Sequence, residues 1–440
     1  MTSKPGVTRL PLFPLTAEVS EQGHLVIGGC DAVELAAEFG TPLYLFDEIG
    51  LRARCAEFIQ EFGQRYADTR VVYAGKAFIN PALALILKEE GLGLDAASAG
   101  ELSIARSAGF PLDDAYFHGN NKSAEELELA LEWGVGRIVV DNFPEMALLD
   151  GMAGEKGVVT EILLRLTPGI DPHTHRHIST GTVDSKFGFT LTAWDEAVAR
   201  AVRAPNLNQV GLHFHLGSLI FEMEPYREAI GVVLAFAAEM KQKYGFELRE
   251  LNVGGGFAVQ YTLAAPAPPV SAYAEAIAPA VISKCRELRL ALPRLVIEPG
   301  RSIVGRSGVA LYKVGVIKDI PGVRCYVAVD GGMGDNIRPA LYEAEYEAVV
   351  ANKMGAVEAR KVTVAGKFCE SGDVLIRDIS LPEVAPGDIL AVATCGAYCL
   401  AMASNYNASL KPAVVMVREG KARLIRRREV FEDLYRCDLV

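Results

Sequence analysis

Lys76 stands at a position where a lysine is unusual and calls for an explanation. It follows the apolar run Val-Val-Tyr-Ala at 71–74 and comes where a buried strand would end. An ammonium group taken out of water needs a partner or loses its proton, and a deprotonated lysine can attack a carbonyl to form a Schiff base. Alternatively, the aliphatic stem lies along the strand end while the charge stays in water. From this segment alone, the solvated lysine is the more common case.

Chemically capable side chains end the other apolar runs of the first 300 residues as well. In a parallel barrel, the carboxyl ends of the strands form the face that carries the active site. Each side chain alone could simply satisfy a loop backbone group, but together they lie where such a fold places catalysis. The set consists of Lys76, Asp95, Ser98, His118, Asn120, Asp141, Arg165, His213, His215, the glycines at 254–256, Glu298 and Arg301.

Three consecutive glycines, Gly254, Gly255 and Gly256, follow the run Leu-Asn-Val. We expect them to open a strand-to-helix turn, where backbone N–H groups and a helix dipole could hold a phosphate. A tight turn needed for steric reasons alone is the alternative. Ser218, at the end of the preceding run, could add a hydroxyl to the same phosphate. Glu298, in Glu-Pro-Gly-Arg, could pair with Arg301 or with a positively charged ligand nitrogen.

Two groups of histidines have the spacing of metal ligands. His213 and His215 lie two residues apart on one predicted strand and face the same way. His173, His175 and His177 share that spacing in a polar loop. Neither group has a nearby carboxylate or thiol that completes a familiar ligand set, so we expect no metal. A ring of His213 or His215 lying flat against a planar cofactor is the preferred interpretation.

The elements that would position these residues alternate regularly. Eight apolar runs end near 77, 98, 120, 142, 168, 218, 256 and 299, with helical patterns between them. Asn80 and Pro81 start one helix and Gly91 ends it, while Ser123 and Glu126 form a capping box. Strict alternation indicates a parallel sheet, and eight units predict an α/β fold with a (β/α)₈ TIM-type barrel over 47–305.

The sequence pattern changes after the predicted barrel. Short apolar runs broken by Gly, Pro and Asp predict a mainly β domain over 306–440. The segment 1–46 contains the strand-like runs His-Leu-Val-Ile and Pro-Leu-Tyr-Leu-Phe, and we expect it to pack with that β domain.

Composition limits the possible partners. The 440 residues carry 44 Lys+Arg against 55 Asp+Glu, a formal net charge of -11, which disfavours nucleic acid and anionic membranes. No apolar run approaches the roughly 18 residues of a membrane span, and the N-terminus has no apolar signal core, so a cytoplasmic protein is expected. The 8 cysteines have no paired spacing, which favours reduced thiols.

These motifs together resemble the alanine-racemase-like barrel family of pyridoxal phosphate (PLP) decarboxylases, in the group that acts on ornithine and diaminopimelate. The resemblance spans about residues 20 to 435. It rests on Tyr-Ala-Gly-Lys-Ala at 73, Asp-Ala-Ala-Ser-Ala-Gly-Glu-Leu at 95, Ser-Lys-Phe-Gly-Phe at 185, His-Phe-His-Leu-Gly-Ser at 213, Gly-Gly-Gly-Phe at 254, Glu-Pro-Gly-Arg at 298, Ile-Arg-Pro-Ala-Leu-Tyr at 337, Cys-Glu-Ser-Gly-Asp at 369, Gly-Ala-Tyr at 396 and Ser-Asn-Tyr-Asn at 404.

The resemblance implies a cofactor site. Lys76 would carry PLP, Glu298 would keep its pyridine nitrogen protonated, and His215 would stack on its ring. The phosphate region would be held by Gly254, Gly255, Gly256, Ser218, Gly300, Arg301 and Tyr398. Cys369, contributed by the second subunit of a homodimer with shared active sites, would donate the proton that replaces CO₂, because a thiol titrates near neutrality.

It also implies decarboxylation of meso-2,6-diaminopimelate to L-lysine and CO₂, the last step of lysine biosynthesis. This substrate is a small diamino acid with a carboxylate and an ammonium at its distal end. Arg301, Arg338 and Tyr342 would bind the carboxylate, and Glu370 the ammonium. Tyr398 would also contact the substrate. A decarboxylase of another carboxylate-bearing amino acid, such as carboxynorspermidine or a carrier-linked amino acid, is the alternative. A non-catalytic PLP-binding barrel and an amino acid racemase are further possibilities.

The chain departs from the family pattern at four positions. Leu219 stands where glutamine is usual, Ala258 where glycine is common, Gly334 where asparagine is often found, and Tyr346 where histidine is frequent. None removes a proposed catalytic group.

Overall fold

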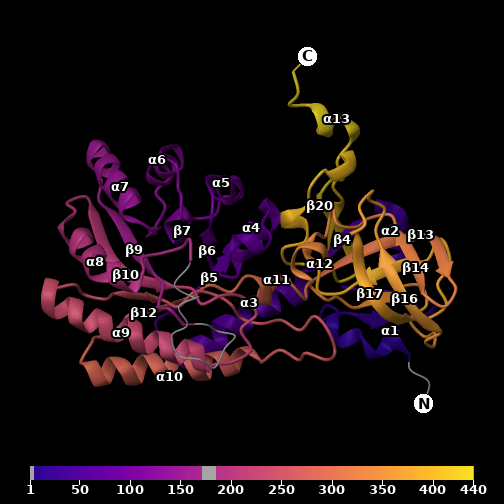
Figure 1. Cartoon of the computed structure of the whole chain (residues 1–440), viewed down its shortest axis with the longest axis horizontal. Coiled ribbons are helices and arrows are strands. Elements are labelled where there is room, and N and C mark those ends of the chain that lie inside the picture. Colours follow the sequence, from indigo (N-terminus) through magenta and orange to yellow (C-terminus); the bar gives the residue numbers. More distant parts are fainter. Residues whose placement is uncertain (1–3, 171–184, 440) are drawn as a thin grey trace. The chain divides into compact units, whose positions relative to one another are not determined.

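The structure is a computed structural model that describes residues 4–170 and 185–439, and the chain forms two compact units. One consists of Cys55–Ala258 and Ala267–Gly300, and the other of Met1–Arg54, Val259–Pro266 and Arg301–Val440. We call them the barrel unit and the β unit. Figure 1 traces both along the chain.

Eight parallel strands close the barrel in the order β10-β11-β12-β5-β6-β7-β8-β9. The α/β fold class predicted from the alternating runs is therefore confirmed. The strands are β5 (Thr69–Ala74), β6 (Gly93–Ala96), β7 (Ala115–Phe117), β8 (Arg137–Val140), β9 (Thr160–Leu166), β10 (Leu207–Phe214), β11 (Glu250–Asn252) and β12 (Arg294–Ile297).

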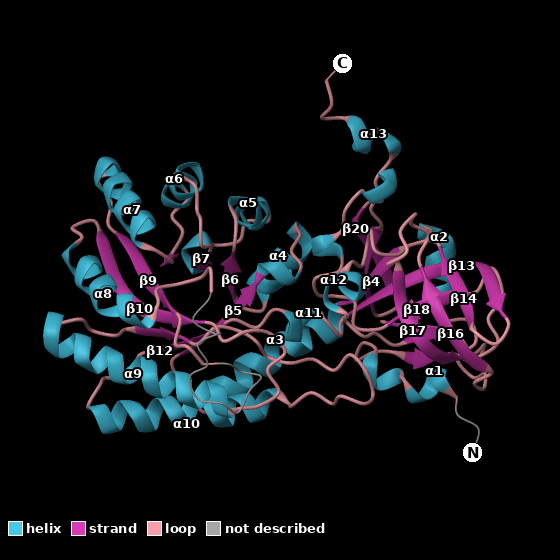
Figure 2. Cartoon of the chain, in the orientation of Figure 1, coloured by secondary structure: helices cyan, strands magenta, loops and turns pink. Residues whose placement is uncertain are grey.

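Helices follow the barrel strands, as the cyan and magenta alternation in Figure 2 shows. α3 (Glu48–Gly63) leads into β5. The others are α4 (Pro81–Glu89), α5 (Ala99–Ser107), α6 (Ala124–Glu132), α7 (Phe143–Lys156), α8 (Trp194–Arg203), α9 (Glu224–Tyr244) and α10 (Val270–Leu288).

Side-chain caps fix where several of these helices begin. Asn80 accepts from the Leu83 amide, and Ser123 and Glu126 form the predicted capping box. Ser98 caps α5 by accepting from the Glu101 amide, so its place in the strand-end set has a structural explanation. These caps satisfy amide groups that the first helical turn leaves without partners, and they hold the loops beyond the strands in one conformation.

The barrel interior is filled by side chains. One buried cluster combines residues of six strands: Val72, Tyr116, Val139, Leu163, Val210 and Val296. At the amino ends of the strands, the Glu250 carboxylate accepts from the Tyr116 hydroxyl at 3.1 Å and from Arg137 Nη2 at 2.8 Å. The opposite charges of Glu250 and Arg137 neutralise one another at this end of the barrel.

The β unit is built on a sheet ordered β17-β16-β14-β13-β4-β19-β20, with β18 pairing both β13 and β15. Its strands are β4 (Leu43–Asp47), β13 (Gly308–Ile320), β14 (Arg324–Val329), β15 (Ala348–Val350), β16 (Arg360–Ala365), β17 (Val374–Leu381), β18 (Ile389–Val392), β19 (Ala413–Arg418) and β20 (Lys421–Arg426). A separate small sheet holds β1 (Glu18–Val19), β2 (Leu25–Ile27) and β3 (Cys30–Asp31). The short helices are α1 (Pro5–Thr8), α2 (Ala32–Phe39), α11 (Arg301–Val304), α12 (Arg338–Tyr342) and α13 (Phe431–Tyr435).

The N-terminal segment supplies a central strand of this sheet. β4 pairs antiparallel with β13 and parallel with β19, and all five of its residues are buried. The prediction that the mainly β domain takes up the N-terminal segment is therefore confirmed. Among the described residues, no helix has the length and apolar character needed to cross a membrane.

Candidate active site

Lys76 lies just beyond its strand, in a short 3₁₀ turn (Gly75–Ala77) after β5. Its neighbours are buried but its own side chain is exposed, so the argument that burial deprotonates it is wrong for this chain. The charge of Lys76 acts on two carboxyl groups. Burial raises the pKa of Glu101 to about 7, and raises that of Asp95, and Lys76 opposes both shifts. The amine therefore stands close to a pair of acids.

Glu298 is the most strongly held of the predicted site residues. It follows β12, is 5% exposed, and accepts from Asn252 Nδ2 at 2.6 Å. His118 Nε2 lies 2.8 Å from one carboxylate oxygen and His213 Nε2 lies 3.3 Å from the other. Burial alone would raise the pKa of Glu298, but the two histidines outweigh it and hold the pKa well below its usual range. The carboxylate is therefore ionised at neutral pH.

His213 thus contacts Glu298, although the sequence suggested a planar cofactor. Burial lowers its pKa to about 4, so the ring is neutral at pH 7. The ligand atoms of His118, His213 and Glu298 lie within 4.8 Å of one another, a spacing that a metal ion could use. Because Asn252 already donates to the carboxylate, we assign the group to hydrogen bonding. The cluster at 173–177 lies outside the described residues.

The glycine turn differs from its prediction in one respect. No helix starts there, because α10 begins only at Val270, so the expected helix dipole is absent from this turn. The Gly254 amide donates to Asn252 Oδ1 at 2.9 Å, and the Gly255 amide to His215 Nδ1 at 3.2 Å. These two N–H groups are engaged within the protein.

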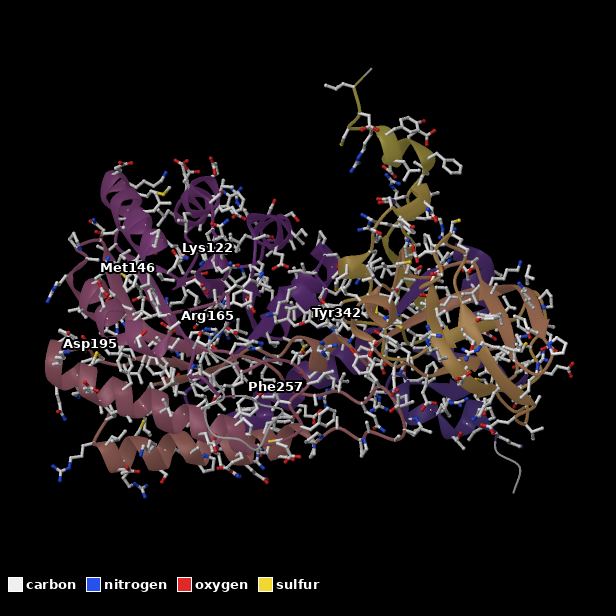
Figure 3. The ribbon with its side chains drawn as sticks, viewed as in Figure 1. Lys122, Met146, Arg165, Asp195, Phe257 and Tyr342 are labelled. Atoms are coloured by element: carbon white, nitrogen blue, oxygen red, sulfur yellow. The ribbon has the colours of Figure 1, made fainter. Side chains whose placement is uncertain are left out.

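The need for glycine in this turn is steric. A Cβ at Gly255 would lie 2.3 Å from the Glu298 carbonyl oxygen, and one at Gly254 would lie 2.6 Å from the Phe214 carbonyl oxygen. Phe257, labelled in Figure 3, follows the turn in sequence, and its ring centre lies 5.0 Å from that of Tyr273. A Cβ at Gly254 or Gly255 would therefore clash with the protein backbone, which is why both positions need glycine.

His215, Ser218 and Gly300 are the remaining predicted cofactor residues of the barrel unit. His215 is partly buried, and burial followed by the charge of Lys76 lowers its pKa well below the usual range. Ser218 is exposed in the loop after β10, and Gly300 is buried, where a Cβ would lie 2.8 Å from Ala74 Cβ. Lys76 and His215 are therefore neighbours at the strand ends.

Arg165 lines the same end of the barrel from β9 and is labelled in Figure 3. Its Nε lies 3.9 Å from Asp141 Oδ1, and burial lowers the pKa of its guanidinium. The Asp141 carboxylate also accepts from the Gly188 amide at 2.8 Å. Arg165 therefore places a positive charge near the ionised Glu298. The negative charge of Glu298 in turn favours the charged form of Arg165.

The β unit brings two predicted substrate residues together through a tyrosine that sequence reasoning missed. Arg301 Nη1 and Arg338 Nη1 both donate to the Tyr261 hydroxyl, at 2.7 and 2.9 Å. Arg338 also donates to the Tyr346 hydroxyl, which lies 3.4 Å from Cys399 Sγ. Tyr346, one of the family departures, is therefore part of the arginine cluster.

Tyr398 also belongs to this cluster. Its ring lies 4.6 Å from the Arg301 guanidinium carbon, a cation–π arrangement. Its backbone has φ +61°, a left-handed conformation that costs energy for a tyrosine. The surrounding fold therefore holds the ring against Arg301 despite local strain.

Tyr342, Cys369 and Glu370 are exposed in the β unit. Tyr342 ends α12 and is 61% exposed, and it is labelled in Figure 3. Cys369 and Glu370 lie in the loop between β16 and β17, where Glu370 Oε1 accepts from the Gly372 amide at 3.2 Å. The proposed substrate-binding roles of Tyr342 and Glu370 stay predictions, as does the role of Cys369 as a proton donor from a second subunit.

The sequence features that could have identified the residues missed by sequence reasoning differ in strength. Asn252 stands as a lone polar residue in the run Leu-Asn-Val, and His118 was already in the strand-end set, so both could have been proposed as partners of Glu298. Tyr261 lies seven residues after Gly254 in an irregular segment, with no pattern to single it out.

Of the remaining departures, only Gly334 has a local explanation, and nothing in the structure explains Leu219 or Ala258. Ala258 donates its amide to the Tyr273 hydroxyl at 3.0 Å, and Leu219 has φ +56°. Gly334 is close-packed against Phe368.

Comparison with known proteins agrees with this geometry. A family model described as "Pyridoxal-dependent decarboxylase, pyridoxal binding domain" matches residues 50–305. The matched range covers the barrel, so the fold corresponds to a class of barrel enzymes that remove a carboxyl group with a pyridoxal cofactor.

Individual relatives identify a family within this class. Diaminopimelate decarboxylase of Bacillus subtilis is 47% identical over 96% of this chain and 97% of its own length. The Synechocystis enzyme of the same name is 44% identical over 97% and 92%. The crystal structure of diaminopimelate decarboxylase from M. jannaschii in complex with L-lysine has a TM-score of 0.90 at 36% identity, covering 97% of this chain and 98% of that one. The chain belongs to the pyridoxal-dependent decarboxylases, and within them to the diaminopimelate decarboxylase family.

Proposed function

We propose that the protein decarboxylates meso-2,6-diaminopimelate to L-lysine and CO₂ with PLP, as the last step of lysine biosynthesis. The observation that carries the proposal is identity of 40–47% over nearly the full length of relatives that share this activity in their names. Full-length coverage matters because all the proposed substrate residues except Arg301 lie beyond residue 305, where the matched pyridoxal domain ends.

The barrel unit fits the cofactor. The group supplies an electron sink for the pair left behind when CO₂ departs. Lys76 would hold it covalently, and the ionised Glu298 would favour a proton on its ring nitrogen. This fits the observed network, in which Asn252 and two histidines keep Glu298 charged inside a buried site.

Further residues would orient the bound group. His215 would lie against its ring, with Nδ1 held by the Gly255 amide. The turn at 254–256 would let the backbone approach the phosphate, together with Ser218, Gly300, Arg301 and Tyr398. Because two of the turn's amides are already engaged, close approach would be its main contribution.

Arg338 supports the choice of substrate. Its guanidinium is buried, and among the described residues its hydrogen-bond acceptors are the neutral hydroxyls of Tyr261 and Tyr346, with no ion pair to a carboxylate. A buried cation without an anion favours binding a carboxylate from a ligand. Arg301, Tyr342 and Tyr398 would complete this end, and Glu370 would meet the distal ammonium.

Cys369 would supply the proton that replaces the departing carboxyl group. It is one of two exposed cysteines, with Cys437, whereas the other six are buried. An exposed thiol in a loop suits delivery into the site of a second subunit, so we propose a homodimer with shared active sites. All eight cysteines are free thiols, which supports our proposal of a cytoplasmic, reducing location.

A substrate panel tests the proposed specificity. The purified holoenzyme is assayed for CO₂ release from meso-diaminopimelate, lysine, ornithine and carboxynorspermidine. We expect the highest kcat/KM for diaminopimelate, because the distal carboxylate of this substrate would neutralise Arg338. A higher kcat/KM for carboxynorspermidine would establish the alternative substrate, and racemisation of recovered diaminopimelate without CO₂ release would establish a racemase.

A further inference from the structure

The segment 404–407, Ser-Asn-Tyr-Asn, has no role in the reaction as described so far. It is firmly attached to the β unit. The Ser404 amide donates to the Gly334 carbonyl oxygen at 2.8 Å. Asn405 Nδ2 donates to the Ser409 carbonyl oxygen at 2.9 Å and to Glu429 Oε2 at 2.6 Å. An exposed segment with this many bonds is held in one place.

Asn407 extends from this segment to the cysteine loop. Its Oδ1 accepts from the Cys369 amide at 2.9 Å, so the bond fixes the main chain of Cys369 and leaves the thiol exposed. Asn407 itself has φ +50°, a left-handed conformation that asparagine adopts more easily than most residues. Residue type and backbone geometry therefore agree on a side chain that reaches Cys369.

The neighbouring residues form a second contact between the same two segments. The rings of Phe368 and Tyr406 stack with centroids 5.9 Å apart at 30°. Phe368 also fills the space over Gly334, where a Cβ would lie 2.3 Å from Phe368 Cζ. The departure from the family pattern at 334 therefore makes room for the ring that precedes Cys369.

Asp373 fixes the loop from its other side. The buried carboxylate accepts from the Phe368 amide at 2.8 Å and from the Met333 amide at 2.7 Å. Cys369 is therefore held between a ring contact at Phe368 and an amide bond at Asn407. Neither contact involves the thiol itself.

We propose that the segment 404–407 is a positioning element for Cys369, with Asn407 as its principal positioning residue. The inference rests on the proposed function, in which Cys369 donates a proton. A proton donor works only within hydrogen-bond reach of the accepting atom, and a displacement of about 1 Å can cost about a hundredfold in rate. Holding the backbone at Cys369 leaves the thiol free to lose and regain its proton.

The test compares Asn407→Ala with Asn407→Asp in the holoenzyme. Asn407→Ala removes the acceptor, whereas Asn407→Asp keeps an oxygen and a residue type that tolerates φ +50°. Asn352→Ala is the matched control, because Asn352 Oδ1 accepts the Ile389 amide at 3.0 Å elsewhere in the β unit. Each variant is checked for bound PLP by absorbance, so that cofactor loss is not mistaken for mispositioning.

Two readouts separate positioning from general damage. Hydrogen exchange of peptides covering 366–373 reports the Cys369 amide directly, and we expect faster exchange in Asn407→Ala only. The solvent deuterium isotope effect on kcat reports proton delivery, and we expect it to rise while kcat falls about fivefold to tenfold, the loss of one hydrogen bond, with KM within about twofold. Asn407→Asp should restore the exchange rate and the isotope effect of the unmodified enzyme.

The inference would be overturned if Asn407→Ala kept the exchange rate and isotope effect of the unmodified enzyme, or if Asn352→Ala changed both equally. The proposed function fails differently. In that case the unmodified holoenzyme releases no CO₂ from diaminopimelate, while the exchange comparison still reports whether Asn407 holds the loop.

Discussion

At the residue scale, the site depends on how Glu298 keeps its charge in a buried position. One amide donor and two imidazoles surround the carboxylate, and the histidines outweigh the burial that would otherwise neutralise it. Glu298 could be predicted from its place at the end of a strand. Asn252 and His118 could also have been proposed as its partners, but their pairing with Glu298 could not be established, because it depends on how neighbouring strands align across the barrel.

The same network predicts how stability depends on pH. His213 has a pKa of about 4 in the folded protein because burial disfavours its charge, against about 6.5 when unfolded. Between these values the unfolded chain binds the extra proton, so acidification lowers the free energy of unfolding by up to about 1.4 kcal/mol per pH unit from this site. The midpoint of thermal unfolding, measured from pH 7 to pH 4.5, should fall, and His213→Gln should reduce the slope. An unchanged slope in the variant would show that other groups control the transition.

Tyr261 provides a second prediction at this scale. Its hydroxyl accepts from both Arg301 and Arg338, so Tyr261→Phe removes the atom that holds the two guanidiniums together. We expect KM for diaminopimelate to rise about tenfold, corresponding to about 1.4 kcal/mol of lost binding, with kcat within about threefold. Steady-state kinetics measures both constants. Tyr244→Phe, which alters a hydroxyl on α9 that donates to Asp195, is the control, and equal KM values for all three proteins would contradict the assignment.

At the scale of elements, strand number and order follow from hydrophobic patterning. Each predicted run overlaps an observed strand that stops a few residues before the run's polar end, as β5 stops at Ala74 and leaves Lys76 in the next turn. The prediction of a helix directly after the glycine triplet was wrong, because glycines in close-packed turns and at helix starts look alike in sequence. The prediction that Lys76 is buried was wrong, because the strand ends at Ala74 and Lys76 lies exposed in the following turn.

The central place of β4 leads to a stability prediction. Leu45 is fully buried between β13 and β19, so Leu45→Ala should lower the free energy of unfolding by about 2–5 kcal/mol through lost packing and a residual cavity. Leu424→Ala, at a 47% exposed site on β20, should cost less than about 1 kcal/mol. Chemical denaturation followed by near-UV circular dichroism compares them. Similar midpoints for both variants would show that the N-terminal strand contributes little.

At the scale of the whole molecule, the two units are made from interleaved parts of the chain. The segment Val259–Pro266 belongs to the β unit although it lies between two barrel segments, a crossing that local patterns do not indicate. The domain limits 1–46, 47–305 and 306–440 stay predictions, as does the dimer. Nothing in hydrophobic periodicity specifies which surface meets a second copy.

The shared active site can be tested by complementation. Lys76→Ala and Cys369→Ala should each be inactive or nearly so when purified alone. After unfolding and refolding of an equimolar mixture, mixed dimers should have one intact site each, which restores about a quarter of the original activity. Cys369→Ala should still bind PLP. If the mixture stayed inactive while refolded unmodified enzyme recovered, Cys369 and Lys76 would not come from different subunits.

The most direct measurement of the central claim is the product formed from meso-diaminopimelate by the PLP-loaded enzyme. We predict one CO₂ and one L-lysine per substrate consumed, with D-lysine absent on chiral chromatography and no turnover by Lys76→Ala. Release of CO₂ by Lys76→Ala at the rate of the unmodified enzyme, or consumption of diaminopimelate without lysine, would contradict the account.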